Sequence, residues 1–205
     1  MSRYVSRVTR SLAGLFGCLL VGAVFVVAPS AAGDAPPPRD LVLSAADVPS
    51  PLVVGAAFTV SNQRIAHDYG LTLRQLTSWG RLTGYRIEFG RTRRPRLTDS
   101  GPLAIKSTDS ICSSAAGAHA YYLNGSRAIP AANRLKHPPK IGNETTMATE
   151  RTVDEGVPLI LYSIGWRQGR VLAGVVVSGI PGRLQLTDVI ALAQKQERKI
   201  IAHTG

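Results

Sequence analysis

Alternation of apolar and polar residues along the chain predicts several β-strands. The clearest is 85–89, where the odd-numbered residues are aromatic or aliphatic and should pack inward, while Glu88 should face outward. A hairpin is predicted later in the chain, because Gln168-Gly169 separates two runs rich in apolar and β-branched residues. The predicted strands are residues 85–89, 104–112, 144–153, 159–166 and 170–177.

Apolar residues spaced three or four apart predict helices between and after these strands. The predicted helices are residues 72–79, a segment capped by Ser113 or Ser114 and ended by Asn124-Gly125, and residues 188–201 capped by Thr187. Residues 128–140 contain three prolines and are predicted to form a loop. Two to three helices on a mostly antiparallel sheet indicate the α+β fold class.

The N-terminal residues have the three-part order of a secretory signal peptide. A basic start with three arginines precedes an uncharged apolar run over residues 12–28, and small residues follow. We therefore predict a signal peptide over residues 1–33, a proline-rich extended spacer over 34–40 and a single domain over 41–205. An uncleaved anchor and lipid attachment at Cys18 are the alternatives, and membrane association is expected only with one of them.

Composition and charge narrow the class of protein further. Hydrophobic residues make up 44 % and charged residues 18 % of the 205 residues, which excludes a disordered chain. Two cysteines are too few for a disulfide-stapled or multi-cysteine zinc fold. Removal of residues 1–33 would take three arginines and no acid from the formal charge of +11, leaving +8. Cys112 would then be the single thiol, predicted to be buried and inert, with pairing to another chain as the alternative.

No combination of residues has the spacing of a known catalytic or metal site. The four histidines share no helical spacing of three or four residues, so no metal site is predicted. His119 is interpreted as a core or boundary residue, and His67-Asp68 as a pair in a loop. The chain has no nucleophile elbow and no glycine-rich phosphate loop, so we predict no catalytic residues and no cofactor.

A cluster of arginines is the most distinctive feature of the sequence. Six arginines fall between Arg81 and Arg96, with Glu88 as the only acid among them. Clustered guanidinium groups bind phosphate and carboxylate, although a solvated basic loop has the same composition. The candidate anion-binding residues are Arg86, Arg91, Arg93, Arg94 and Arg96. For a secreted chain the expected partner is a polyanion of the cell envelope, and nucleic acid is excluded because the loop also lacks aromatic residues for stacking.

The order of several short motifs resembles a group of small secreted proteins and lipoproteins of high-GC bacteria. The matching motifs are Leu41 to Pro49 with its Ser44 and Asp47, Gly84-Tyr85 with Phe89, the alanine-rich Ala115 to Ala118, Ile141-Gly142-Asn143-Glu144, and Arg167-Gln168-Gly169. The resemblance covers residues 41–201 and implies a Mog1/PsbP-like α/β/α sandwich, a fold also found in extracellular sensor domains of some bacterial kinases. It further implies an accessory, binding or sensing role without catalytic residues. The chain departs from the pattern at Ser50-Pro51, where glycine is usual, and at Asn143, where aspartate is usual.

These observations predict a secreted, non-enzymatic domain that binds an anionic component of the cell envelope or a partner protein. Two other functions stay open. A sensor, or a carrier of lipid or another small ligand, would need an enclosed apolar cavity. A hydrolase acting on the cell wall would need a cleft that holds a convergent acid and base.

Overall fold

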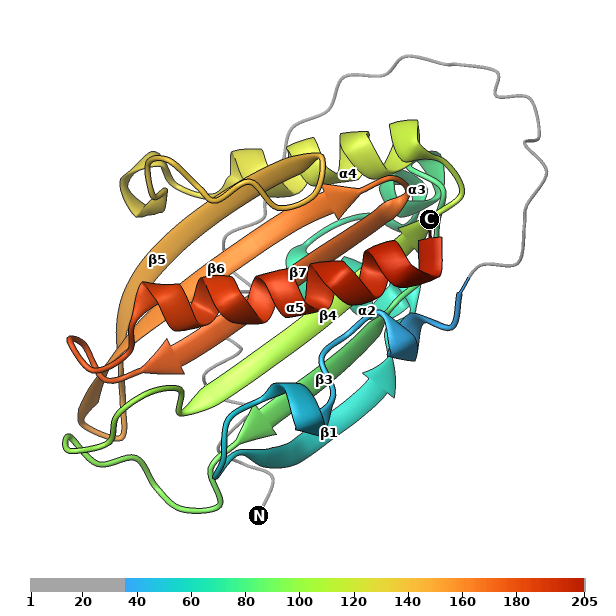
Figure 1. Cartoon of the computed structure of the whole chain (residues 1–205). Helices are drawn as coiled ribbons and strands as arrows, with labels where there is room; N and C mark the ends of the chain where they lie inside the picture. The colour runs from blue at the N-terminus through green and yellow to red at the C-terminus, as the bar shows by residue number, and fades with distance from the viewer. Residues whose placement is uncertain (1–35, 205) are drawn as a thin grey trace.

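One antiparallel sheet forms the centre of the molecule (Figure 1). The computed structural model describes residues 36–204. Six of the seven strands lie in the order β1-β3-β4-β7-β6-β5, and the seventh, the short β2, pairs with β4. The strands are β1 (Val53–Thr59), β2 (Arg81–Thr83), β3 (Tyr85–Gly90), β4 (Ala104–Cys112), β5 (Glu144–Asp154), β6 (Val157–Gln168) and β7 (Val171–Gly179).

Helices cover both faces of this sheet, which confirms the predicted α+β class. The α-helices are α2 (Asn62–Tyr69), α3 (Leu73–Ser78), α4 (Ala115–Ala128) and α5 (Leu186–Thr204), and the 3₁₀ helices are η2 (Pro38–Asp40), η3 (Ala45–Asp47) and η4 (Ala131–Asn133). The main core joins α5 to one face of the sheet, through residues such as Ile164 and Val175. On the other face, Tyr122 of α4 lies 2.6 Å from Thr146 of β5, measured between their hydroxyl oxygens. A second cluster joins α2 and α3 to Tyr121 of α4, so these three helices share that face.

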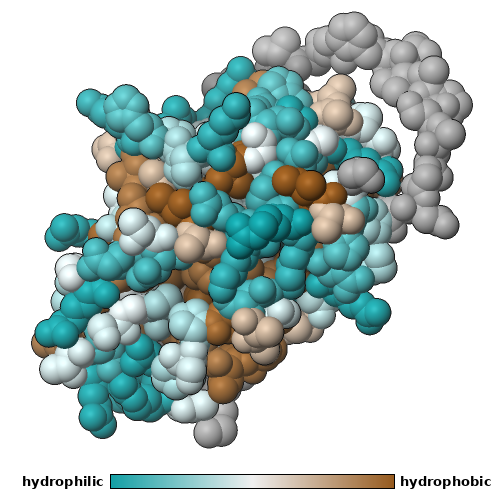
Figure 2. All heavy atoms as spheres, viewed as in Figure 1, coloured by the Kyte–Doolittle hydropathy of each residue, from teal (hydrophilic) through white to brown (hydrophobic). Residues whose placement is uncertain are grey.

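Buried polar groups fix α5 on the sheet in addition to its apolar side chains. The amide of Gln196 is fully buried, accepts a hydrogen bond from Ser107 Oγ at 2.8 Å and donates one to Thr108 O at 2.9 Å. The indole of Trp166 donates to the carboxylate of Glu197. Figure 2 shows hydrophilic residues along the outer side of α5, with apolar residues visible beside it. Since a buried polar atom is costly without its partner, these bonds set the position of the helix along the strands.

An N-terminal strap, residues 38–48, packs against the same face as α5. Leu41 and Leu43 are fully buried in the main core. The ammonium of Lys199 on α5 lies 2.7 Å from the Asp47 carboxylate and donates to Val42 O at 3.1 Å. The strap is therefore part of the hydrophobic core, although it precedes β1, the first strand of the sheet.

The strap changes the predicted domain boundary. Pro38–Asp40, the last part of the predicted extended spacer, forms η2, because the next residue is already anchored in the core. The predicted signal peptide over residues 1–33 lies outside the described residues. Among residues 36–204, no helix has the length and hydropathy needed to cross a bilayer.

The elements β1 and α2 have no counterpart among the predicted elements. β1 is apolar without alternation and has mostly exposed residues, so the pattern for a half-buried strand is missing. The helix α2 is mainly polar, begins at Ser61, whose side chain accepts from Arg64 N, and ends at Gly70 in the left-handed conformation. His67 and Asp68 lie on this helix, so the loop predicted for them is wrong.

The outward orientation predicted for Glu88 is also wrong. Ile87 and Phe89 pack with the main core as expected, but Glu88 is only 7 % exposed on the opposite side of β3. Strict alternation predicts which residues share a face, but it does not show whether the second face meets solvent. Here the second face is covered by helices, and burial raises the pKa of Glu88.

The helix α4 continues past the predicted end at Asn124-Gly125 and stops at Ala128. An arginine from outside the helix satisfies its last carbonyls. The guanidinium of Arg134 donates to Ser126 O at 2.9 Å and to Arg127 O at 3.3 Å. The last carbonyls of a helix are often satisfied by a glycine cap, but here the Arg134 side chain satisfies them. The helix can therefore continue past Gly125.

Candidate functional site

A cavity lies between α4 and the sheet, on the face opposite α5. Its volume is about 240 Å³, the space of about eight water molecules at liquid density. Residues of its floor, such as Thr108, Ser163 and Val176, are half-buried, whereas Ile105 and Val175 on the α5 side are buried. Most of the lining surface is apolar. The sheet is thus tightly packed on one face and hollow on the other.

Two glycines make the floor of this cavity flat. Gly165 of β6 and Gly174 of β7 are partners in the strand register, and both line the cavity. A Cβ placed on Gly165 would come no closer than 3.9 Å to another atom, Ala173 O. A Cβ on Gly174 would come no closer than 3.4 Å, to Thr108 Oγ1. Close packing within the protein therefore does not require glycine at either position.

Three residues with charged side chains line the cavity: Lys106, Asp109 and Glu150. Burial raises the pKa of Asp109 to about 8. Burial also raises the pKa of Glu150, whose Oε2 atom is buried without a hydrogen-bond partner in the described structure. Lys106 is half-buried and makes no hydrogen bond or ion pair with any residue between 36 and 204. Burial thus opposes ionisation of both acids, and Lys106 is the one basic residue among the described residues that line the cavity.

A polar cluster connects the first turns of α4 to the edge of the sheet. Glu144 of β5 accepts hydrogen bonds from His119 Nδ1, at 2.8 Å, and from Arg167 Nε. Burial opposes ionisation of Glu144, but the bonds from His119 and Arg167 hold its pKa below the usual range. The His119 side chain is 48 % exposed, so the prediction of a core or boundary residue is wrong, and the residue lies at the surface with Glu144 as its partner.

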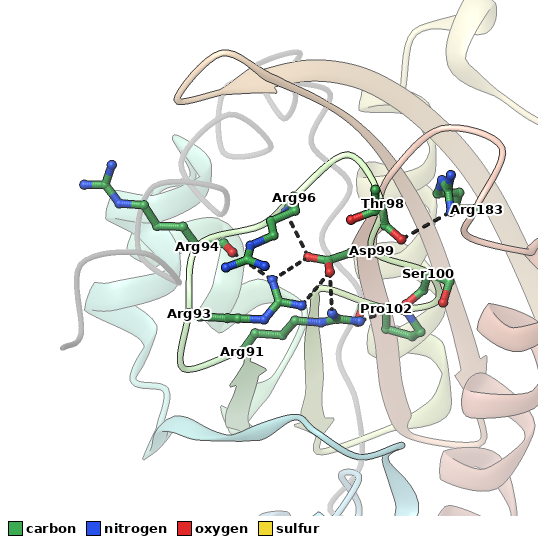
Figure 3. A network of polar contacts seen from close by, with 9 residues as sticks. All are labelled: Arg91, Arg93, Arg94, Arg96, Thr98, Asp99, Ser100, Pro102 and Arg183. Carbon is green, nitrogen blue, oxygen red and sulfur yellow. Dashed lines mark hydrogen bonds and ion pairs between the residues drawn. The ribbon is translucent and has the colours of Figure 1, made fainter.

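The arginine loop, residues 91–102, folds around one acid, Asp99 (Figure 3). Asp99 is only 6 % exposed and lies 3.1 Å from the guanidinium of Arg91. It accepts further bonds from Arg93 Nη1 at 3.0 Å and from the backbone N–H of Arg96 at 2.9 Å. The bond from Arg93, aided by those from Arg96 and Arg91, holds the pKa of Asp99 at about 2. Two of the candidate anion-binding arginines therefore already share an anion.

The guanidinium groups of Arg94 and Arg96 differ in whether they have a partner within the protein. Arg94 is 83 % exposed, points away from the rest of the loop in Figure 3, and lies 3.4 Å from the Glu155 carboxylate. The guanidinium of Arg96 has no hydrogen-bond or ion-pair partner in the described part of the chain. Sequence reasoning missed Asp99 because it follows the cluster. Its position three residues after Arg96, where a carboxylate can accept from the Arg96 backbone N–H, was the signal that could have found it.

Arg86 does not belong to the arginine loop. It lies on β3 and is 6 % exposed. Its guanidinium pairs with Asp68 of α2 at 3.3 Å and lies over the ring of Phe58, 5.6 Å from the ring centroid. Arg86 therefore serves to hold α2 on the sheet, a structural role that clustering in the sequence did not reveal.

No metal centre is formed by the part of the chain that the structure describes. Within residues 36–204, no group of three or more His, Cys, Asp or Glu side chains is arranged to hold an ion. Among the described residues that line the cavity there is neither histidine nor cysteine.

Cys112 is expected to be unreactive in the folded protein. Its thiol is unpaired and fully buried, and burial raises its pKa to about 11. We expect iodoacetamide to leave Cys112 unmodified in the native protein and to alkylate it after unfolding in guanidinium chloride, as measured by peptide mass spectrometry. Rapid labelling of the native protein at Cys112 would contradict the burial of its thiol.

The fold and cavity together define an α+β sandwich domain with one hollow face. A scan against protein-family models gives no match, and a search of curated proteins gives no match either. Among solved structures, the chain is similar to the extracellular domain of PknH from Mycobacterium tuberculosis, with 9 % sequence identity and a TM-score of 0.47. That alignment covers 80 % of this chain and 94 % of the PknH domain. A TM-score at this level is too low to establish a shared fold.

Proposed function

We propose that this chain is a non-enzymatic binding module that works outside the cytoplasm and holds a small, mainly apolar ligand in the cavity under α4. One observation carries the proposal: the paired glycines Gly165 and Gly174 keep the cavity floor free of side chains. The extracytoplasmic location rests on the signal-peptide pattern of residues 1–33.

The glycine pair is costly unless the space above it is used. Glycine in the middle of a strand destabilises a protein by about 0.5–1 kcal/mol relative to alanine, because it loses more backbone freedom and packs no side chain. In strands it often marks a place where a ligand or another backbone approaches closely. Among the described residues, the atom nearest to a Cβ on Gly165 would be the backbone oxygen of Ala173 at 3.9 Å, an ordinary contact distance that does not require glycine. The space above Gly165 therefore supports the proposal that a ligand approaches the sheet here.

The contents of the cavity also favour binding over catalysis. Its lining is mainly apolar, with a few hydroxyl groups, one lysine and the two acids Asp109 and Glu150, and the described lining residues include no histidine or cysteine. Pockets that bind small molecules have this composition: an apolar wall with a small number of polar groups. The arginine loop supports anion binding less strongly, because Asp99 already occupies Arg91 and Arg93.

A graded series at Gly165 tests the proposal. We expect Gly165→Ala, Gly165→Val and Gly165→Leu to weaken binding of 1-octanol progressively, with Leu lowering the affinity by more than about tenfold. The same changes should leave thermal stability unchanged or raise it, because a Cβ at this position would come no closer than 3.9 Å to Ala173 O and the new residue improves strand propensity. Binding is measured by NMR titration, and stability by thermal unfolding.

The control is Val153→Leu, which enlarges an exposed side chain on β5 of the same sheet. It should change neither octanol binding nor stability by a measurable amount. If the Gly165 variants unfold, glycine serves packing. If octanol shifts no signals of β6, β7 and α4 in the native protein, the cavity is not a binding site.

A further inference from the structure

We propose that the ligand of this cavity is an anionic amphiphile, with an apolar body on the glycine floor and its negatively charged head group bound by the ammonium of Lys106. The inference rests on the proposed function, and it adds the charge of the ligand and the residue that binds the charged group. The head group is a carboxylate or a phosphate monoester, both of which accept hydrogen bonds from an ammonium ion.

Lys106 is the only cation among the described residues that line the cavity. It lies on β4, in register with Glu88 of β3 on one side and Val176 of β7 on the other. Its side chain is half-buried, yet it forms no ion pair or hydrogen bond with residues 36–204. Partial burial removes water from an ammonium group and is unfavourable unless an anion compensates.

Burial opposes the ionisation of Glu88 on β3 and of Asp109 on β4, which weakens the compensation these acids can give to Lys106. Glu88 is the lateral neighbour of Lys106, but its burial raises its own pKa even with Lys106 nearby. Burial raises the pKa of Asp109 to about 8, so at neutral pH its carboxyl group is mostly uncharged. An anionic head group of a ligand would therefore compete for Lys106 with acids whose ionisation burial opposes.

The strand register gives the cavity one polar end and one apolar middle. Lys106, Val176, Ser163 and Ala148 follow one another across β4, β7, β6 and β5 as register partners. The glycine pair lies two residues further along the strands, beside this row. Glu150 is on β5, three strand spacings from β4, which is about 14 Å. A ligand lying across the strands thus has its head at Lys106 and its body on small and apolar residues.

Four ligands of the same chain length test the inference: octanoate, octyl phosphate, 1-octanol and octylamine. Isothermal titration calorimetry with the full chain is expected to show that octanoate or octyl phosphate binds at least about tenfold more tightly than 1-octanol, and that octylamine binds more weakly than octanol. The relative affinity of the two anions tells which head group is preferred.

Lys106→Met, which keeps the aliphatic stem, should reduce the affinity for the anionic ligands to that of octanol. The affinity of Lys106→Met for 1-octanol should stay within about twofold of the affinity of the unmodified protein. The matched control is Lys136→Met, at an exposed lysine outside the cavity lining, which should preserve the preference for anions.

The possible failures are distinguishable. Equal binding of octanol and octanoate, sensitive to Gly165→Leu, would overturn the anionic inference and keep the proposed function. A preference for octylamine that Glu150→Gln removes would overturn it in favour of a cationic ligand. Absence of binding by all four compounds would overturn the proposed function itself.

Discussion

Replacing Arg81 with Met is expected to lower the free energy of unfolding by about 3–5 kcal/mol. Arg81 is 3 % exposed and is the centre of a buried polar network under α2 and α4. Its guanidinium donates to Ser110 Oγ at 3.1 Å, to Asn62 Oδ1 at 2.6 Å and to Val60 O at 3.0 Å. Methionine fills the space of the stem but removes the buried donor that all three acceptors share.

The loss should depend on pH because of Asp109. Arg81 is a nearby positive charge that partly offsets the burial of Asp109, whose pKa is nonetheless raised to about 8. In the folded state Asp109 keeps its proton up to that pH, whereas in the unfolded chain it loses the proton near 3.8. The stability that protonated Asp109 contributes is therefore complete below about pH 4 and is lost as the pH rises to about 8. Without Arg81 the ionised form is less favourable still, so the variant should be most impaired at the alkaline end.

Urea unfolding of the unmodified protein and Arg81→Met at about pH 5 and about pH 8.5 measures both effects. Arg151→Met on β5 is the control, since Arg151 is exposed and should tolerate the change within about 0.5 kcal/mol. A loss from Arg81→Met as small as that of the control would show that the network under α4 does not stabilise the fold.

Replacing Asp99 with Asn is expected to lower the free energy of unfolding by about 1.5–3 kcal/mol near pH 7, by weakening charged hydrogen bonds within the arginine loop. The pKa of Asp99 is held at about 2 in the folded protein, below the value of 3.8 for an isolated group. A lowered pKa means that its contribution to stability is present above about pH 4 and lost as the pH falls to about 2. The unmodified protein and Asp99→Asn should therefore differ at neutral pH and converge in acid.

The same variant tests the anion-binding prediction for the arginines. The neutral amide of Asp99→Asn would no longer neutralise Arg91 and Arg93, so affinity for a polyanion such as heparin should increase and become more dependent on salt. Asp40→Asn is the control, because the Asp40 carboxylate makes only an exposed contact of 3.6 Å with Arg39. If Asp99→Asn binds heparin no better than this control, the arginine loop has a purely structural role.

Much of the sheet could be predicted from local patterns because its strands have strong alternation or continuous apolar runs. The predicted strand over residues 104–112 coincides with β4, and the hairpin around Gly169 is formed by β6 and β7. The helix predicted over residues 72–79 is α3, with Thr72 as its N-cap. Each of these elements could be predicted because its pattern lies entirely within residues that are close in sequence.

The cavity could not be predicted in the same way because it depends on how distant segments meet. Gly165 and Gly174 lie nine residues apart in two strands, and only the hairpin register places them side by side. Asp99 neutralises arginines only because the loop folds back on itself, and Glu88 is buried only because helices cover the second face. Glycine inside an otherwise apolar strand was the one local sign of the open floor.

The contact between the N-terminal strap and α5 has a consequence for the kinetics of folding. Lys195 donates to Asp47 O across 148 residues of sequence, and Lys199 to Val42 O across 157. The residues that cover Leu41 and Leu43 are thus among the last of the chain. Because such long-range contacts slow folding, the core should close in one late cooperative step that requires α5. A chain that stops before Leu186 would keep one face of its sheet in water however long it was allowed to fold.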